Sequence, residues 1–218
     1  MIKLVSVTKS YPTKQGRHFI LNKANFEMKK GEKIGILGKN GSGKTTLVRI
    51  LAGVIPPDEG RVIRDMKVSW PVGYHGGFNR ALTGLDNIKF ISKIYNERFG
   101  KVLKFVQDFA ELDDFINEPM NTYSTGMRAK LNFGLMMAID FDCYLIDELL
   151  NVGDISFRQK CNKELFEKRK DKSIVIVSHN DKLIQQYCDK AMVFHNQQIF
   201  DFSNTKEAIQ FYHNSIKS

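Results

Sequence analysis

The 218-residue chain has few cysteines, and Cys143, Cys161 and Cys188 show no CxxC spacing. Three cysteines leave one unpaired if the other two are bridged, so a reducing cytosol fits this sequence best. No stretch approaches about 18 consecutive apolar residues, so we expect no membrane-spanning helix. The first residues alternate apolar and polar like a strand, and we do not expect them to form a secretion signal.

The sequence also has little that would indicate a nucleic-acid binder. Lys and Arg exceed Asp and Glu by 33 to 24, a net charge of +9 that attracts phosphate groups of any kind. A single tryptophan and scattered aromatics do not form a basic, aromatic stacking surface, so no nucleic-acid partner is expected. Repeats, low-complexity tracts and Pro/Gly/Ser linkers are absent, and 42% hydrophobic residues suffice for one substantial core.

The apolar pattern changes along the chain. After short strand-like runs, a helix is predicted over residues 45–52. From residue 83 to 138 apolar residues recur three or four apart, which predicts helices. Residues 143–147 and 173–178 are continuous apolar runs typical of buried parallel strands, and residues 205–217 predict a terminal helix.

These patterns predict one α/β domain with an inserted helical lobe. We expect residues 1–82 and 140–218 to form the α/β core, beginning with an antiparallel β region. Residues 83–139 are expected to form the inserted α-helical subdomain.

The stretch GKNGSGKT matches the pattern GxxxxGK[ST] and lies between a predicted strand and a predicted helix. Its glycines let successive backbone N–H groups face an anion, and the following helix adds its positive end. Lys44 can then reach the β and γ phosphates of a nucleotide, and Thr45 offers a hydroxyl to Mg²⁺. The residues expected to bind nucleotide are Gly38, Lys39, Asn40, Gly41, Ser42, Gly43, Lys44, Thr45 and Thr46.

Three further polar residues follow apolar runs. Asp147 ends the predicted strand CYLID and is a candidate, with Thr45, for holding the metal ion and its hydration shell. Glu148 can polarise an attacking water as a general base. His179 follows another such strand, and because ligands bind at the carboxyl ends of parallel strands, it can bond a γ-phosphate or the catalytic water. The candidate catalytic residues are therefore Lys44, Glu148 and His179, and Tyr11 is a candidate for stacking on a base.

The order and spacing of these motifs, together with YSTGM at residues 123–127 and Asp154, resemble the ATP-binding subunits of ABC transporters over nearly the whole chain. The resemblance implies a P-loop NTPase (RecA-like) core of ABC type, with ATP and Mg²⁺ as cofactors. It also implies that two copies close head to tail on two ATP molecules, each copy completing the other's site. The resemblance implies that Ser124, Gly126 and the N–H groups that enter the helix after Thr125 hold the partner's γ-phosphate. Met127 and Asp154 are further residues that it implies for nucleotide binding.

Departures from the common family pattern indicate a branch. Thr125 and Met127 replace a glycine and a glutamine of the usual LSGGQ signature, and no glutamine lies between Trp70 and Leu82, where the family normally carries one. SWPVGYHGGFNRALTG, TYSTGMRAKLNFGL and DELLNVGD are similar to ATPases that export capsular polysaccharide across the inner membrane of Gram-negative bacteria.

That similarity implies a peripheral ATP hydrolase on the cytoplasmic face of the inner membrane. The partners it implies are a second copy, a polytopic membrane permease and a lipid-linked polysaccharide carried by the complex. Exporters of O-antigen or teichoic acid stay open as alternatives, although O-antigen exporters often carry a C-terminal carbohydrate-binding domain for which we expect no room here. A soluble ABC ATPase acting on nucleic acid or ribosomes is the alternative from another class. Such proteins typically carry a coiled-coil insertion or a second ATPase half, and we expect neither here.

Overall fold

A computed structural model describes the protein over residues 1–72, 77–147, 154–178 and 180–217. The chain forms two compact units. The first unit consists of Met1–Pro71, Phe141–Glu148 and Asp171–Ser218, and the second consists of Val72–Asp140 and Leu149–Lys170. Within the described residues, no helix is both long and apolar enough to traverse a bilayer.

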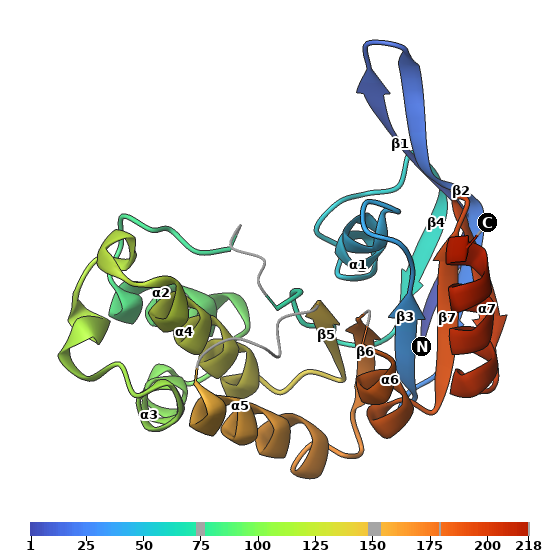
Figure 1. Ribbon diagram of the computed structural model, residues 1–218. Coiled ribbons are helices and arrows are strands. Elements are labelled where there is room, and N and C mark those ends of the chain that lie inside the picture. The colour runs from blue at the N-terminus through green and yellow to red at the C-terminus, as the bar shows by residue number, and fades with distance from the viewer. Residues whose placement is uncertain (73–76, 148–153, 179, 218) are drawn as a thin grey trace. The chain divides into compact units, whose positions relative to one another are not determined.

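The first unit begins with an antiparallel sheet, sheet A, in the strand order β2-β1-β4. Strands β1 (Ile2–Thr13) and β2 (Gly16–Met28) form a long hairpin, and β4 (Glu59–Arg64) pairs with the other side of β1 (Figure 1). Alternate side chains are buried in one core where the hairpin is regular, with Ile2 and Leu4 on β1 and Ala24, Phe26 and Met28 on β2, as the period of a half-buried strand requires. The predicted antiparallel β region at the N-terminus is confirmed.

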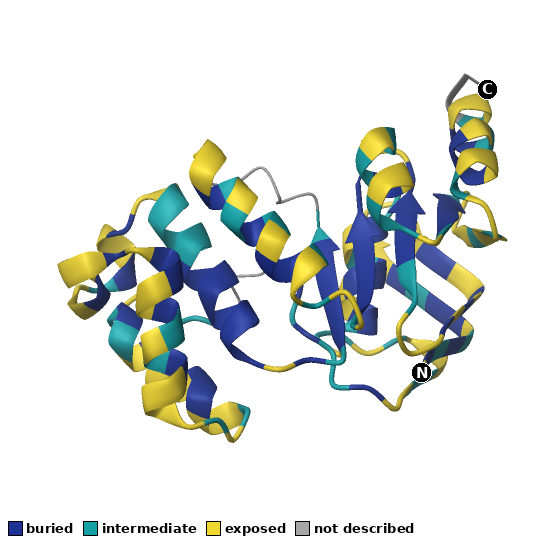
Figure 2. Cartoon of the chain, turned by 90° about the horizontal axis from the view of Figure 1, so that it is seen from below, coloured by how far each residue is buried: buried dark blue, intermediate teal, exposed yellow. Residues whose placement is uncertain are grey.

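The same unit contains a five-stranded sheet, sheet B, in the order β5-β6-β3-β7-β8. Its first four strands are parallel, and β8 is antiparallel to β7. Figure 2 shows β3, β5 and β6 buried along almost their whole length, as the continuous apolar runs predicted. The bounds are β3 (Lys33–Leu37), β5 (Cys143–Asp147), β6 (Ser173–Val177), β7 (Lys190–His195), β8 (Gln198–Phe202), α1 (Lys44–Leu51), α6 (Asp181–Tyr187) and α7 (Thr205–Lys217).

Both lateral edges of sheet B are bonded to other parts of the chain. On the β5 edge, the Ser69 N–H donates to the Cys143 carbonyl at 2.9 Å, and the Ser69 hydroxyl accepts from the Leu145 N–H at 2.9 Å. On the β8 edge, the Gln198 side-chain amide donates to the Asn22 carbonyl of β2 at 2.5 Å. These bonds join the edge strands to segments outside the sheet.

The second unit is helical, as predicted for the insertion. Its elements are α2 (Gly84–Ile94), α3 (Phe99–Ala110), the 3₁₀ turns η1 (Asp113–Asn117) and η2 (Met120–Thr122), α4 (Thr125–Ala138), α5 (Ile155–Asn162) and the π-helical turn η4 (Lys163–Glu167). Thr83 starts α2 because its hydroxyl accepts the Asp86 N–H at 3.0 Å, an N-cap that replaces a missing helical bond.

Helix α5 packs with the inserted helices, although the sequence placed it in the α/β core. The Phe157 ring lies edge-on to Phe109 at 5.5 Å and to Phe133 at 6.4 Å. Lys160 Nζ donates to the Asp108 carbonyl of α3 at 2.7 Å. The second unit therefore begins at Val72 and gains residues 149–170, which differs from the expected range 83–139. These long-range aromatic contacts leave no local pattern in the sequence.

Candidate functional site

The topology of sheet B brings three of the motif segments to one edge. Strand β3 lies between β6 and β7, and Ile36 of β3 and Asp147 of β5 both pair with Val177 of β6. Gly38 directly follows β3, Asp147 ends β5, and Ser178 directly follows β6. The carboxyl ends of parallel strands, where ligands bind in such sheets, thus carry the P-loop and the candidate metal ligand.

The P-loop between β3 and α1 is closely packed, and its glycines are required by geometry. A Cβ on Gly38 would lie 2.7 Å from the Phe194 carbonyl oxygen. Gly43 has φ +109°, and a Cβ there would lie 2.2 Å from Ile20 Cγ2. Gly41 has φ +77° and is open to solvent. Positive φ values of this kind turn successive N–H groups inward, which makes an anion-binding concavity.

Lys44 begins α1 and its side chain lies within the loop, only 7% exposed. Its Nζ donates to the Gly38 carbonyl at 2.7 Å and to the Lys39 carbonyl at 2.9 Å. The ammonium charge is therefore held within the loop, beside the N-terminus of α1. Both features favour an anion at this point.

The residues around this loop fit a phosphate and a hard divalent cation. The Thr45 hydroxyl donates to Asp147 Oδ2 at 3.4 Å, so an alcohol and a carboxylate, the oxygen ligands that Mg²⁺ prefers, face each other. Ser42 Oγ is buried and has no hydrogen-bond partner among the described residues, which suits a group completed by a ligand. Lys39 and Asn40 are exposed at the loop tip, and Thr46 lies in the first turn of α1.

Two predicted catalytic residues, Glu148 and His179, lie outside the described residues. Their flanking residues are described: Asp147 ends β5, and the Asn180 side chain caps α6 by accepting the Lys182 N–H at 3.1 Å. Tyr11 lies on β1 with its residue 40% exposed, opposite His18 across the hairpin. Its ring is accessible for stacking, and the Lys9 ammonium lies 5.7 Å from its centroid.

In the second unit, the segment YSTGM starts α4. The Ser124 hydroxyl accepts the Met127 N–H at 3.1 Å, so Ser124 is the N-cap. Tyr123 is buried and donates to the Phe115 carbonyl at 2.5 Å, which fixes the approach to the helix. A Cβ on Gly126 would meet only Ser124 Oγ, at 3.8 Å. Packing within this copy therefore does not require a glycine there, whereas close approach of an external group would.

A cavity of about 400 Å³ brings Ser124, Gly126 and Met127 together with Asp154, which the sequence had linked only by resemblance. The Asp154 carboxylate caps α5 by accepting the Phe157 N–H at 2.8 Å, and this bond lowers the pKa of Asp154. Thr125 is exposed, and its hydroxyl accepts from Arg128 Nη2 at 3.2 Å.

Lys130 also lines this cavity and was not singled out from the sequence. Its Nζ lies 4.0 Å from Asp154 Oδ2 and 5.3 Å from the centre of the Phe157 ring. Lys130 thus joins the helix that starts at Ser124 to the helix that starts at Asp154. The signal in the sequence was weak, because a lysine on a helix is most often a solvated surface residue.

Residues 21–151 match the family model described as ABC transporter. The chain belongs to the ABC transporter family. The capsule polysaccharide export ATP-binding protein CtrD of Neisseria meningitidis is 48% identical over 97% of this chain and 98% of its own length. The polysialic acid transport ATP-binding protein KpsT of Escherichia coli is 44% identical over 97% of this chain and 98% of its own length.

Among solved structures, a dimeric ATP-binding cassette, MJ0796, bound to ADP and Pi has a TM-score of 0.78 at 22% identity. It matches 93% of this chain and 98% of its own chain. That likeness supports the fold, and it confirms the prediction of an ABC-type α/β P-loop domain. The order of motifs that led to the family assignment therefore identified the ABC family correctly.

Proposed function

We propose that this ABC chain is the ATP-hydrolysing subunit of a transporter that exports capsular polysaccharide across the inner membrane of Gram-negative bacteria. The observation that carries this proposal is identity of 44–48% to CtrD and KpsT over nearly the full length of all three chains. The P-loop geometry supports the ATPase part, because the buried Lys44 and a glycine loop that leads into a helix N-terminus suit a triphosphate.

In this proposal the P-loop residues bind and orient the phosphates. The Lys44 ammonium, which donates to the Gly38 and Lys39 carbonyls in this structure, would donate to the β and γ phosphates when nucleotide binds. Thr45 and Asp147 would hold Mg²⁺, directly or through its waters, because their hydroxyl and carboxylate oxygen atoms face each other. When bound, the metal ion offsets negative charge that develops on the phosphate oxygens.

Glu148 and His179 are assigned to the water that attacks the γ-phosphate. Each directly follows a described residue at the carboxyl edge of sheet B, Asp147 of β5 and Ser178 after β6. Glu148 polarises the water as a general base, and His179 bonds the γ-phosphate or that water. Tyr11 supplies an exposed ring on which the adenine stacks.

The cavity at the start of α4 is assigned to the ATP of a second copy. Ser124, Gly126 and the N-terminal end of α4 form a positive helix end that suits a γ-phosphate. The open space at Gly126 supports this, since its own chain does not fill it. Two copies would then share two sites, each built from one P-loop and one Ser124 loop.

The complex is proposed to lie on the cytoplasmic face of the inner membrane, with this chain bound peripherally to a polytopic permease. The segment from Trp70 to Ile88 is the proposed permease-facing surface. The permease, and not this chain, would provide the path for the lipid-linked polysaccharide.

The hydrolytic roles are tested by two substitutions with matched controls. Lys44→Ala should abolish ATP binding without unfolding the chain, whereas Lys104→Ala, at an exposed lysine of α3, should bind ATP normally. Glu148→Gln should bind ATP and accumulate as a dimer while turnover falls steeply, about 10²-fold or more for loss of a general base. Glu167→Gln, at an exposed glutamate of η4, is its control. Unchanged turnover in Glu148→Gln would remove Glu148 from the base role.

The shared site is tested by mixing two inactive variants. Lys44→Ala has no working P-loop, and Ser124→Asp places a negative charge where the partner's γ-phosphate should bind. A mixed dimer contains one site with both Lys44 and Ser124 intact, so the mixture should regain turnover that neither variant has alone. Absence of recovery, with mixed dimers present, would contradict the shared site.

Export itself is tested in the natural host. Deletion of the gene should abolish surface capsule while the polysaccharide accumulates inside the cell, and the wild-type gene, but not Lys44→Ala, should restore it. Purification of the tagged chain from membranes should also recover a polytopic partner. Normal surface capsule after deletion would refute the export role.

A further inference from the structure

The C-terminal helix α7 is fixed against sheet B. Ala208, Ile209 and Tyr212 are buried, and the Phe211 ring contacts Phe200 and Phe202 of β8 at centroid distances of 5.2 and 5.3 Å. These contacts determine which face of α7 points toward the sheet.

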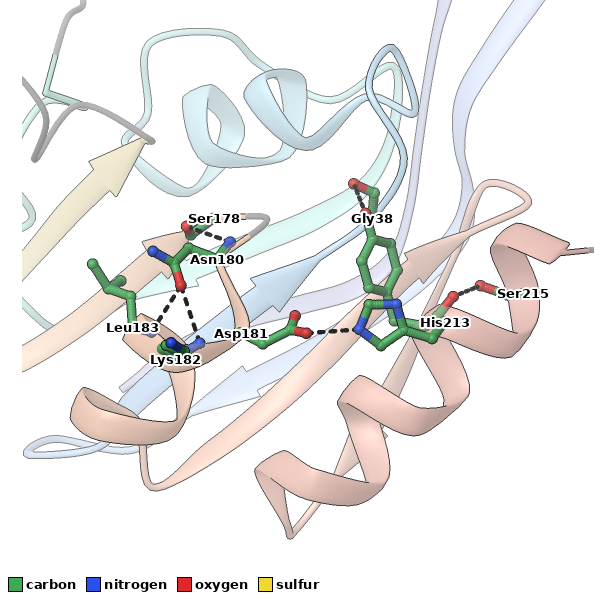
Figure 3. Close-up of polar contacts among 9 residues, drawn as sticks. Gly38, Ser178, Asn180, Asp181, Lys182, Leu183, His213 and Ser215 are labelled. Atoms are coloured by element: carbon green, nitrogen blue, oxygen red, sulfur yellow. Dashed lines mark hydrogen bonds and ion pairs between the residues drawn. The ribbon is translucent and has the colours of Figure 1, made fainter.

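A polar contact sets the position of α7 along its axis as well. His213 Nε2 lies 2.6 Å from Asp181 Oδ2 in the first turn of α6 (Figure 3). The Ser215 hydroxyl donates to the Tyr212 carbonyl at 2.8 Å, also drawn in Figure 3. The side chains of this helix are therefore held in a defined register beside the P-loop strand.

This register places the Tyr212 hydroxyl on the nucleotide site. Tyr212 Oη donates to the Gly38 carbonyl oxygen at 3.4 Å, and both groups are buried. The same carbonyl accepts from Lys44 Nζ at 2.7 Å. A carbonyl oxygen has two lone pairs, so it can accept both bonds at once. One residue of the terminal helix and the phosphate-binding lysine thus share an acceptor.

We propose that Tyr212 is a positioning residue for ATP binding, which holds the Gly38 carbonyl in place when the Lys44 donors are drawn toward phosphate oxygens. Without nucleotide, Lys44 satisfies this buried carbonyl. With nucleotide bound, the ammonium is shared with the phosphates, and the Tyr212 hydroxyl becomes the more important donor because a buried carbonyl needs a partner. The inference rests on ATP binding at the P-loop, one part of the proposed function, and not on polysaccharide export.

This role differs in a measurable way from simple packing. If Tyr212 only fills space, Tyr212→Phe keeps the ring and changes nothing beyond stability. If Tyr212 supports Gly38, Tyr212→Phe destabilises the ATP-bound state more than it destabilises the free state. ATP affinity then falls while the free protein unfolds at nearly the same temperature.

The first measurement is the Kd for ATP, determined by calorimetric titration of the full chain. Tyr212→Phe should weaken ATP binding about fivefold, the effect of losing one modest hydrogen bond. The control is Tyr144→Phe in β5, where another buried hydroxyl, accepting the Phe141 N–H at 3.3 Å, is removed from the same unit. Tyr144→Phe should leave the Kd unchanged. An unchanged Kd in Tyr212→Phe would overturn the proposal.

The second measurement needs no nucleotide. Lys44→Met removes the other donor to Gly38 with an apolar side chain of similar length. Tyr212→Phe should therefore lower the unfolding temperature more in the Lys44→Met background than in the wild type. Equal shifts in the two backgrounds would also overturn the proposal. This result stands even if the wild-type chain fails to bind ATP, an outcome that would count against the proposed function instead.

Discussion

Gly43→Ala tests whether the P-loop is held by packing against sheet A as the structure indicates. Gly43 has φ +109°, and its new Cβ would lie 2.2 Å from Ile20 Cγ2, where carbon atoms normally approach to about 3.5–4.0 Å. The positive φ costs an alanine about 1–2 kcal/mol. Displacement of Ile20, which is 9% exposed within the core, adds about 1–3 kcal/mol of overpacking. We expect a loss of about 2–5 kcal/mol.

The matched control is Gly41→Ala in the same loop. Gly41 has φ +77°, but a Cβ there has nothing within 4 Å, so only the backbone term of about 1–2 kcal/mol applies. Both variants are compared by urea unfolding of nucleotide-free protein, followed by far-UV circular dichroism. Gly43→Ala should unfold at a clearly lower urea concentration than Gly41→Ala.

A double-mutant cycle with Ile20→Ala isolates the steric term. Ile20→Ala removes the clashing methyl group, so adding Gly43→Ala to it should cost about 1–3 kcal/mol less than adding Gly43→Ala to the wild type. Equal costs in the two backgrounds would refute the reasoning, as would equal stabilities of Gly41→Ala and Gly43→Ala. Either result would mean that Ile20 does not press on the loop.

Three further outcomes follow from described contacts. Hydrogen bonds from Lys9 and then from Ser10 lower the pKa of Asp58 to about 2, so Asp58→Asn should lower the free energy of unfolding by about 1 kcal/mol at pH 6. In urea unfolding, the difference in stability between the wild type and Asp58→Asn should disappear as the pH falls from 3.8 toward 2, because Asp58 becomes protonated. Arg169→Met should lower the stability measured by thermal unfolding by about 2–4 kcal/mol, because the largely buried Glu164 carboxylate loses an ion-pair partner at 2.5 Å. Lys168→Met removes the more exposed partner of Glu164 and should lower it by less than about 1 kcal/mol. Equal losses of stability in the two variants would contradict this account. Burial raises the pKa of the Cys143 and Cys161 thiols to about 12, so a disulfide reagent at pH 8 should react with these two only after denaturation. Rapid labelling of either residue in the native protein would contradict their burial.

Much of the fold could be predicted from the sequence because its signals are local. The parallel strands β5 and β6 are unbroken apolar runs, and α7 spans Thr205–Lys217, the range that its apolar spacing predicted. The place of α5 could not be predicted in this way. Its assignment to the second unit depends on Phe157 meeting Phe109, 48 positions earlier in the chain.

The candidate site divides in the same manner. The P-loop was readable because the tight turn needs glycine and a phosphate needs N–H groups and a cation within eight successive residues. The contact of Tyr212 with Gly38 spans 174 positions, and no local spacing indicates it. The role of Lys130 could not be predicted from the sequence, because only the folded helix brings its ammonium near Asp154.

The occupied edges of sheet B restrict how a second copy can attach. A strand from a second copy that extended sheet B would have to displace the Ser69 hydrogen bonds beside β5 or the hydrogen bond between Gln198 and Asn22 beside β8. Fibre-like growth by strand addition is thereby disfavoured. We therefore expect two copies to associate through the loops and helix N-termini beyond the strand ends, where contacts can form and break while the hydrogen bonds of the sheet stay intact.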